Sequence, residues 1–241
     1  MSWGIPVPDR VPAGGLGWGR ALLSGSGVPA DALGNLGDRY YDTATGRWYL
    51  KRWVGNFDGS DVAIPSSEPP LGSGFIARAV FKTQAAMGSS GLVDIMGREL
   101  SFKLRTSASY LSLLLGTGAG WGFNSSTIFN LFDSTWYRVE IDTLTVPGTL
   151  KIKLNGTEIL NVAHGTAIGP SASGFRIGTV TNPSNIRPTA LVEFGGSRWA
   201  MGEGFGTTLV DSSGLGRNCT VTDAIPATFW AQTWVPMDLL A

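Results

Sequence analysis

The sequence has very few residues that bind soft metals or form disulfides. It contains one cysteine, Cys219, and one histidine, His164. A structural zinc site needs four such ligands, and an iron–sulfur cluster is held by several cysteines. Both kinds of centre are therefore excluded. A disulfide within the chain is excluded as well, because a lone cysteine has no partner.

Charged residues are also scarce, and their signs balance. They make up 15% of the chain, with 18 basic and 18 acidic side chains, against roughly 25% charged residues in an average soluble domain. Binding to nucleic acid relies on basic side chains that neutralise phosphates. Because no basic run offers such a surface, we expect no nucleic acid among the partners.

Long apolar segments are missing too. The longest apolar run lies around 111–115, far below the roughly 20 residues that cross a bilayer as a helix. The first ten residues contain Pro6, Pro8 and Asp9 and lack the apolar stretch of a secretion signal. We therefore expect a protein made in a cytoplasm without a signal peptide and without membrane insertion.

Glycine, in contrast, is abundant, and apolar residues alternate with polar ones from Phe75 onward. There are 34 glycines, and 43% of the chain is hydrophobic, which at this length is enough for a sizeable core. Alternation with a period of two is typical of strands that have one face in a core. Asn155-Gly156 predicts a type I′ hairpin. The clearest alternating runs lie at 75–82, 102–105, 137–142 and 150–154.

The first fifty residues differ from the rest, because prolines and glycines are interspersed there with little apolar periodicity. Such a segment cannot pack a core alone. Aromatic residues flank its turn-forming stretch 42–46, which predicts a small β-hairpin. We expect an extended arm with this hairpin over 1–53 and a β-sandwich over 54–241. The flanking aromatic residues are Tyr40, Tyr41, Trp48 and Tyr49.

The stretch 24–52, with Gly37-Asp38, the sequence DTATG at 42–46 and Lys51, resembles a tract found in fibres and structural proteins of tailed bacteriophages. In those proteins the tract often lies near collagen-like repeats. The resemblance implies a virion protein whose residues 1–53 contact other virion proteins and support a homo-oligomer, with a homotrimer as the first expectation. Composition alone leaves open an ordinary linker that contains one hairpin.

The middle of the chain resembles concanavalin A-like or laminin-G-like jelly-roll domains. A tryptophan-led strand TWYRVEID is followed by the hairpin TLKIKLNGTEI and by FRIG, and NFDGSDVAIP is similar to an early stretch of that family. The resemblance implies an antiparallel jelly-roll β-sandwich of the concanavalin A-like kind. The quoted segments occupy residues 135–142, 149–159, 175–178 and 56–65.

Residues 199–222 resemble the segment that normally opens such a domain, although here they lie near the end of the chain. A circular permutation accounts for this order, because the first and last strands of the sandwich lie close together. It predicts that the tail from Ala200 returns beside the strand that starts at Phe75. A truncated second copy of the domain is the alternative.

Aromatic side chains in loops are the candidate glycan-binding residues, because flat apolar faces can stack on sugar rings. Trp121, between two glycines, and Tyr110, at a predicted strand start, are the best placed for exposure. A place in the core is the alternative for both. The resemblance thus implies a virion protein that contacts the host cell surface through a lectin-like sandwich.

The sequence does not favour catalysis. Retaining hydrolysis of a glycosidic bond needs two carboxyl groups close together, and the sequence lacks the closely spaced carboxylates that sandwich-fold glycanases carry. We expect no enzyme and no catalytic residue. A polysaccharide depolymerase that uses Glu193 or Glu203 is one alternative function. A decoration or cement protein of the virion without glycan binding is another.

Asp58, Asp61 and Asp211 lie in predicted turns that could offer oxygen ligands to Ca²⁺, and calcium sites occur in laminin-G-like domains. The alternative is that these aspartates accept hydrogen bonds from their own turns. No other cofactor is expected.

Overall fold

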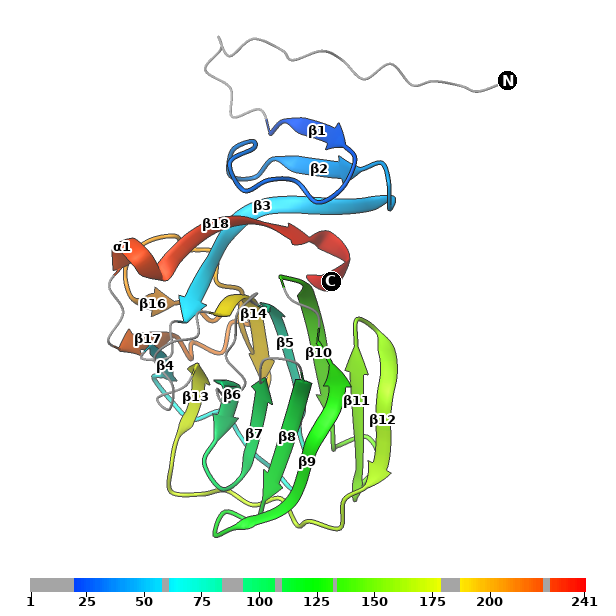
Figure 1. Ribbon diagram of the computed structural model, residues 1–241. Coiled ribbons are helices and arrows are strands. Elements are labelled where there is room, and N and C mark those ends of the chain that lie inside the picture. The colour runs from blue at the N-terminus through cyan, green and yellow to red at the C-terminus, as the bar shows by residue number, and fades with distance from the viewer. Residues whose placement is uncertain are drawn as a thin grey trace.

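The computed structural model describes residues 20–57, 61–83, 93–106, 110–131, 134–178, 187–222 and 226–241. Over these ranges the chain consists almost entirely of strands, apart from a four-residue helix, α1 (Pro226–Phe229), and a short 3₁₀ helix, η1 (Met237–Leu239). No helix there is long and apolar enough to cross a membrane. Two sheets pack face to face (Figure 1), so the predicted all-β sandwich is confirmed.

The first sheet has ten strands in the order β1-β2-β3-β14-β5-β10-β11-β12, with β15 beside β14 and β18 beside β3. Only the pair β1 and β2 among them is parallel. Its strands are β1 (Leu22–Gly25), β2 (Arg39–Asp42), β3 (Arg47–Phe57), β5 (Ile76–Lys82), β10 (Trp136–Asp142), β11 (Thr149–Leu154), β12 (Thr157–Ala163), β14 (Arg187–Phe194), β15 (Ser197–Trp199) and β18 (Trp230–Pro236).

The second sheet has eight strands in the order β16-β17-β4-β13-β6-β7-β8-β9, and all its pairs are antiparallel. Its strands are β4 (Val62–Pro65), β6 (Val93–Arg98), β7 (Phe102–Thr106), β8 (Tyr110–Gly116), β9 (Trp121–Asn130), β13 (Phe175–Gly178), β16 (Thr208–Leu209) and β17 (Cys219–Thr222).

The main core lies between the two sheets and follows the predicted alternation. On β5, Ala77, Ala79 and Phe81 are fully buried, while Arg78 and Lys82 are only half-buried. The hairpin between β11 and β12 turns at Asn155-Gly156, where both residues have positive φ, as predicted. Rings from both sheets meet in the middle of the core, where Phe75, Phe102, Phe175, Phe194 and Trp199 pack on one another.

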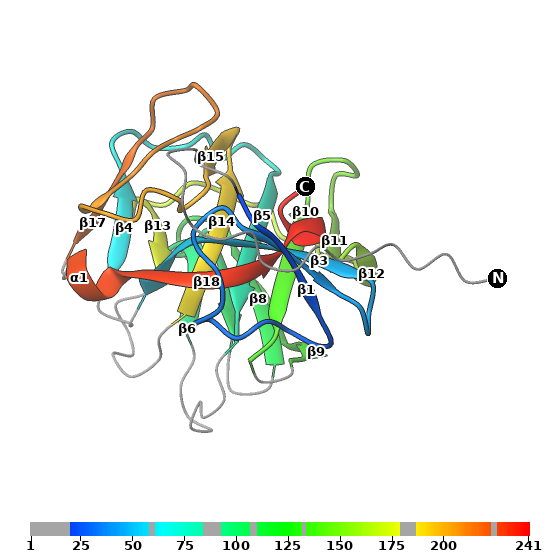
Figure 2. The same cartoon turned by 90° about the horizontal axis from the view of Figure 1, so that it is seen from above.

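A second, smaller core covers part of the outer face of the ten-stranded sheet. Val80 on β5 and Leu191 on β14 point away from the main core, and Val235 of β18 and Leu239 of η1 pack against them. Seen from above in Figure 2, β18 crosses over β14. The end of the chain therefore covers part of the outer face of this sheet.

The predicted aromatic hairpin is confirmed. Strands β2 and β3 pair antiparallel with Tyr41 opposite Trp48, and together with β1 they stand beyond the sandwich at the top of Figure 1. We call residues 20–51 the cap. The boundary predicted at 53/54 falls inside β3, which runs from the cap into the sandwich. The division into two parts stays a prediction.

The tail from Ala200 does return to the sandwich, but its predicted place is wrong. Strand β17 pairs with β4, and β18 pairs with β3. Neither can lie beside β5, because β10 and β14 already occupy both edges of that strand. Two apolar residues of the tail stay exposed, Phe205 at 78% and Val210 at 48%. The circular permutation itself stays a prediction.

Candidate functional site

The outer face of the eight-stranded sheet carries a row of polar side chains. Because Phe102 and Leu104 of β7 face the core, the residues between and after them, Lys103 and Arg105, face away from it. The same alternation on β8 sends Leu111, Leu113 and Leu115 inward. It leaves Tyr110 and Ser112 on the outer face.

Strand pairing brings these outward residues into one row. Ser112 lies opposite Arg105, and Arg105 lies opposite Asp94 of β6. Lys103 lies opposite Leu114, whose other neighbour is Asn124 of β9. We define the polar strip as Asp94, Lys103, Arg105, Ser112 and Asn124, together with the aromatic residues Tyr110 and Trp121.

Ion pairs fix the charged middle of the polar strip. Asp94 accepts a hydrogen bond of 2.7 Å from Nε of Arg105, and its second oxygen lies 3.5 Å from Nζ of Lys103. Lys103 also pairs with Glu99. Asp94 and Lys103 are 8% and 9% exposed. The two acids, Asp94 and Glu99, and the two bases, Lys103 and Arg105, thus compensate one another.

Trp121 is held at one end of the strip by a cation. The ammonium nitrogen of Lys103 lies 5.9 Å from the centroid of the indole ring, within the range of a cation–π contact. The indole is half-buried, so part of its surface reaches solvent. Contrary to the loop that was expected, Trp121 is the first residue of β9.

The structure does not bring Tyr110 and Trp121 together. Trp121 pairs with Gly116 at one end of the β8–β9 ladder, whereas Tyr110 pairs with Asn130 at the other. Tyr110 starts β8, as predicted, and is half-buried. Six residues of extended chain separate the two ends of β8, which is about 20 Å. One sugar ring cannot touch both aromatic residues.

Sequence reasoning missed the charged members of the strip. The alternation at 102–105 indicates that Lys103 and Arg105 face outward, but it does not say which strand lies beside them. Asp94 has no distinguishing pattern in the sequence. Only the pairing of β6, β7 and β8 shows that these residues form one surface with Trp121.

The three aspartates proposed for calcium are not seen together. Asp58 lies outside the described residues. Asp61 is buried just before β4. Within the described part of the chain, no three histidine, cysteine, aspartate or glutamate side chains gather where they could hold a metal ion. Calcium binding stays a prediction.

The carboxylate of Asp211 is occupied by hydrogen bonds from nearby residues. Its carboxylate accepts hydrogen bonds from the backbone N–H groups of Arg198, Ser213 and Arg217 and from the Ser213 hydroxyl, at 2.6 to 3.1 Å. Burial acts to raise the pKa of Asp211, but the N–H and O–H donors outweigh it and hold the pKa at about 2. The carboxylate is therefore ionised near neutral pH and already engaged on both oxygens.

The two glutamates of the depolymerase alternative have different surroundings. Glu193 faces outward from β14, where one carboxylate oxygen bonds Arg78 at 2.8 Å and the other bonds Arg198 at 2.5 Å. Glu203 follows β15 and accepts a hydrogen bond from the backbone N–H of Val210 at 2.9 Å. A carboxylate held by two guanidinium groups is suited to joining strands. Enzymatic activity stays untested.

No protein-family model matches the chain, and no curated protein matches it in sequence. Its fold is similar to that of a Bacteroides ovatus protein that has been proposed to bind carbohydrate, with a TM-score of 0.53, 19% identity and coverage of 86% of this chain and 71% of that one.

Two further solved structures show more distant likeness. A domain of a Ruminococcus gnavus sialidase, bound to α2,3-sialyllactose, covers 57% of this chain and 89% of its own, with 10% identity and a TM-score of 0.38. A Caenorhabditis elegans galectin covers 56% of this chain and 95% of its own, with 12% identity and a TM-score of 0.36. At such identities the comparisons concern the fold alone, and the chain shares a β-sandwich fold with the Bacteroides ovatus protein.

Proposed function

We propose that this protein binds glycans and that the polar strip is its binding surface. The observation that carries the proposal is the half-buried Trp121 ring beside the Lys103 ammonium and the Asp94–Arg105 ion pair. Sites for small ligands combine apolar or aromatic surfaces with a few placed polar groups. An indole face can receive the C–H face of a sugar, and charged groups form the stronger hydrogen bonds with hydroxyls.

The charge of the strip favours a neutral glycan. Asp94 and the neighbouring Glu99 offset Lys103 and Arg105, so these four side chains together carry no net charge. Sugar hydroxyls both donate and accept hydrogen bonds, as this mixture of carboxylates and cations requires. Because Trp121 and Tyr110 lie about 20 Å apart along the strand, by its rise per residue, the ligand that uses both is an oligosaccharide.

The wider role that we propose is that of a bacteriophage virion protein that contacts the host cell surface. The resemblance of 24–52 to a tract of phage fibres supports it. In this proposal residues 1–53 contact other virion proteins, and the assembled form is a homotrimer. Sedimentation equilibrium at micromolar concentration checks the oligomer, for which we expect three times the mass of the 25.4 kDa chain.

A glycan array probed with the full chain tests the binding proposal, followed by calorimetry on the best neutral oligosaccharide. We expect Trp121→Ala to weaken binding about fivefold, because an aromatic contact contributes about 1 kcal/mol. Phe205→Ala is the control, since Phe205 is 78% exposed and lies outside the strip.

Two results of this experiment would contradict glycan binding by the strip. One is an array without any bound glycan, and the other is undiminished affinity in Trp121→Ala. An empty array together with tight incorporation into particles would favour a decoration or cement protein. Release of reducing ends from host polysaccharide, abolished in Glu193→Gln or in Glu203→Gln, would favour the depolymerase.

A further inference from the structure

A second surface with aromatic and charged groups lies on the cap, away from the polar strip. A cleft of about 780 Å³ opens there between the hairpin and the end of the chain. This volume is within the roughly 300 to 1,000 Å³ of small-molecule sites. The residues that matter for its chemistry are Leu22, Arg39, Arg47, Trp48, Met237 and Asp238.

The hairpin presents Trp48 as a rigid platform. Because Tyr41 pairs with Trp48 across β2 and β3, their rings share one face of the hairpin and lie 4.8 Å apart. The neighbouring pair, Tyr40 and Tyr49, points to the opposite face and is buried with Trp234. The Tyr41 ring thus packs beside the indole of Trp48, and Trp48 is still 40% exposed.

One guanidinium at the cleft is engaged and another is available. Arg47 donates two hydrogen bonds to Asp238, at 2.9 and 2.8 Å, which joins the hairpin to η1. Arg39 is exposed and pairs with no carboxylate among the described residues. Two arginines against one aspartate leave the cleft with a net positive charge.

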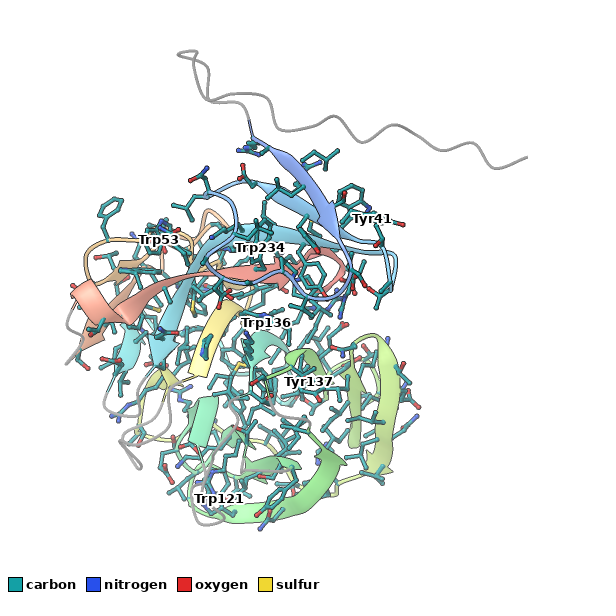
Figure 3. The ribbon with its side chains drawn as sticks, turned by 45° about the horizontal axis from the view of Figure 1, so that its top comes forward. Tyr41, Trp53, Trp121, Trp136, Tyr137 and Trp234 are labelled. Carbon is teal, nitrogen blue, oxygen red and sulfur yellow. The ribbon has the colours of Figure 1, made fainter. Side chains whose placement is uncertain are left out.

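From this geometry we propose that the cleft binds a saccharide that carries a carboxylate. One sugar face stacks on Trp48 beside Leu22, and the carboxylate pairs with Arg39, whose planar guanidinium matches it in two hydrogen bonds. The proposal does not rest on the polar strip. Trp121 and Tyr41 mark the two surfaces in Figure 3, at opposite ends of the molecule.

The test uses trigalacturonic acid and its fully methyl-esterified form as matched probes, with the full chain in calorimetry. We expect the acid to bind and the ester to bind at least tenfold more weakly. We expect added salt to weaken binding of the acid, because the contact at Arg39 is exposed to screening.

Two variants of the cleft and two controls complete the experiment. Trp48→Ala and Arg39→Gln are each expected to lower affinity for the acid at least tenfold, and Arg39→Gln should keep the melting temperature because the side chain is exposed. Trp121→Ala and Phe205→Ala should bind the acid like the unaltered chain. This set separates failure of the cleft from failure of the strip.

Several outcomes would overturn the cleft proposal. The first is that trigalacturonate does not bind, and the second is that the ester binds as tightly as the acid. The third is that Arg39→Gln and a folded Trp48→Ala both bind the acid as tightly as the unaltered chain. The fourth is that Trp121→Ala loses binding of the acid. A rise in molecular mass with concentration that Trp48→Ala abolishes would also overturn it, because a second copy of the chain would then occupy the cleft.

Discussion

Different interactions stabilise the sandwich and the cap. In the sandwich, fully buried phenylalanine, leucine and isoleucine side chains fill the space between two sheets. The cap has a cluster of only Tyr40, Tyr49 and Trp234, with Leu23 packed against it. The buried residues that remain in the cap include three charged ones, Asp38, Asp42 and Lys51.

Lys51 is the centre of the cap. Its ammonium donates to the backbone carbonyls of Asp31, Leu33 and Gly34, at 2.5, 2.7 and 3.1 Å, and lies 5.7 Å from the centroid of the Trp234 ring. All three N–H donors of the ammonium are therefore used. One side chain thus closes the loop between β1 and β2.

Asp38 and Asp42, at the two ends of β2, stabilise the cap through hydrogen bonds that their carboxylates accept. Asp38 accepts hydrogen bonds from the backbone N–H groups of Ala21 and Asn35, both at 2.7 Å. Asp42 accepts one from the Thr45 hydroxyl at 2.6 Å, and this bond, against the effect of burial, is the main cause of its lowered pKa. The glycines of the same tract, Gly37 and Gly46, have φ of 86° and 73°.

The two regions place different constraints on their residues. Many apolar side chains of similar volume can fill a sandwich core. In the cap, an atom in one place satisfies a specific backbone group, so Asp38, Asp42 and Lys51 have few substitutes.

The largest effect is expected from a truncation in the sandwich. Phe102 is fully buried and contacts the rings of Phe75, Phe175 and Phe194. Phe102→Ala should lower the free energy of unfolding by about 3 to 5 kcal/mol, because it leaves a cavity. Urea denaturation checks this value. The exposed Phe205→Ala should change it by less than about 0.5 kcal/mol, and an equal loss in both would refute the argument.

A smaller loss is expected when the ammonium of the cap is removed. Lys51→Met keeps an unbranched side chain but leaves three carbonyl oxygens without their donor. The expected cost is about 3 kcal/mol, since each unsatisfied buried group costs roughly 1 to 3 kcal/mol and part of this is recovered from water.

Hydrogen exchange measures where that loss falls. In Lys51→Met the amides of β1 and β2 should exchange faster while those of β7 and β8 stay protected. Lys153→Met is the matched control, because Lys153 is exposed on β11. Equal acceleration in both sheets would show that the cap and sandwich open as one unit.

The smallest change in stability is expected at Asp211. Like the aspartates of the cap, it is a buried carboxylate that accepts several hydrogen bonds, but it lies in the sandwich. Its folded pKa of about 2 is below the ordinary value of 3.8. The carboxylate therefore stabilises the folded state fully above about pH 4, and this contribution disappears as the pH falls towards 2. Asp211→Asn should be less stable at pH 6 and show a flatter loss between pH 4 and pH 2. Denaturation across this range checks it, and parallel curves would contradict it.

Much of the sandwich could be predicted from alternation, because a strand with one buried face needs apolar residues at every second position. Ala77, Ala79 and Phe81 follow this rule, and so do Lys103 and Arg105 on the other sheet. The alternation does not indicate which strands lie next to one another. It therefore could not show that β10 and β14 enclose β5, or that β18 covers β14.

Local sequence patterns predicted the class of structure and the hairpin of the cap, because periodicity and turn residues act over a few neighbouring positions. The candidate binding surfaces depend on the packing of distant strands. Lys103 meets Trp121, and Arg47 meets Asp238 across 191 positions, only after the strands have paired. Such contacts depend on distances in space that no local pattern encodes, and both candidate binding surfaces consist of them.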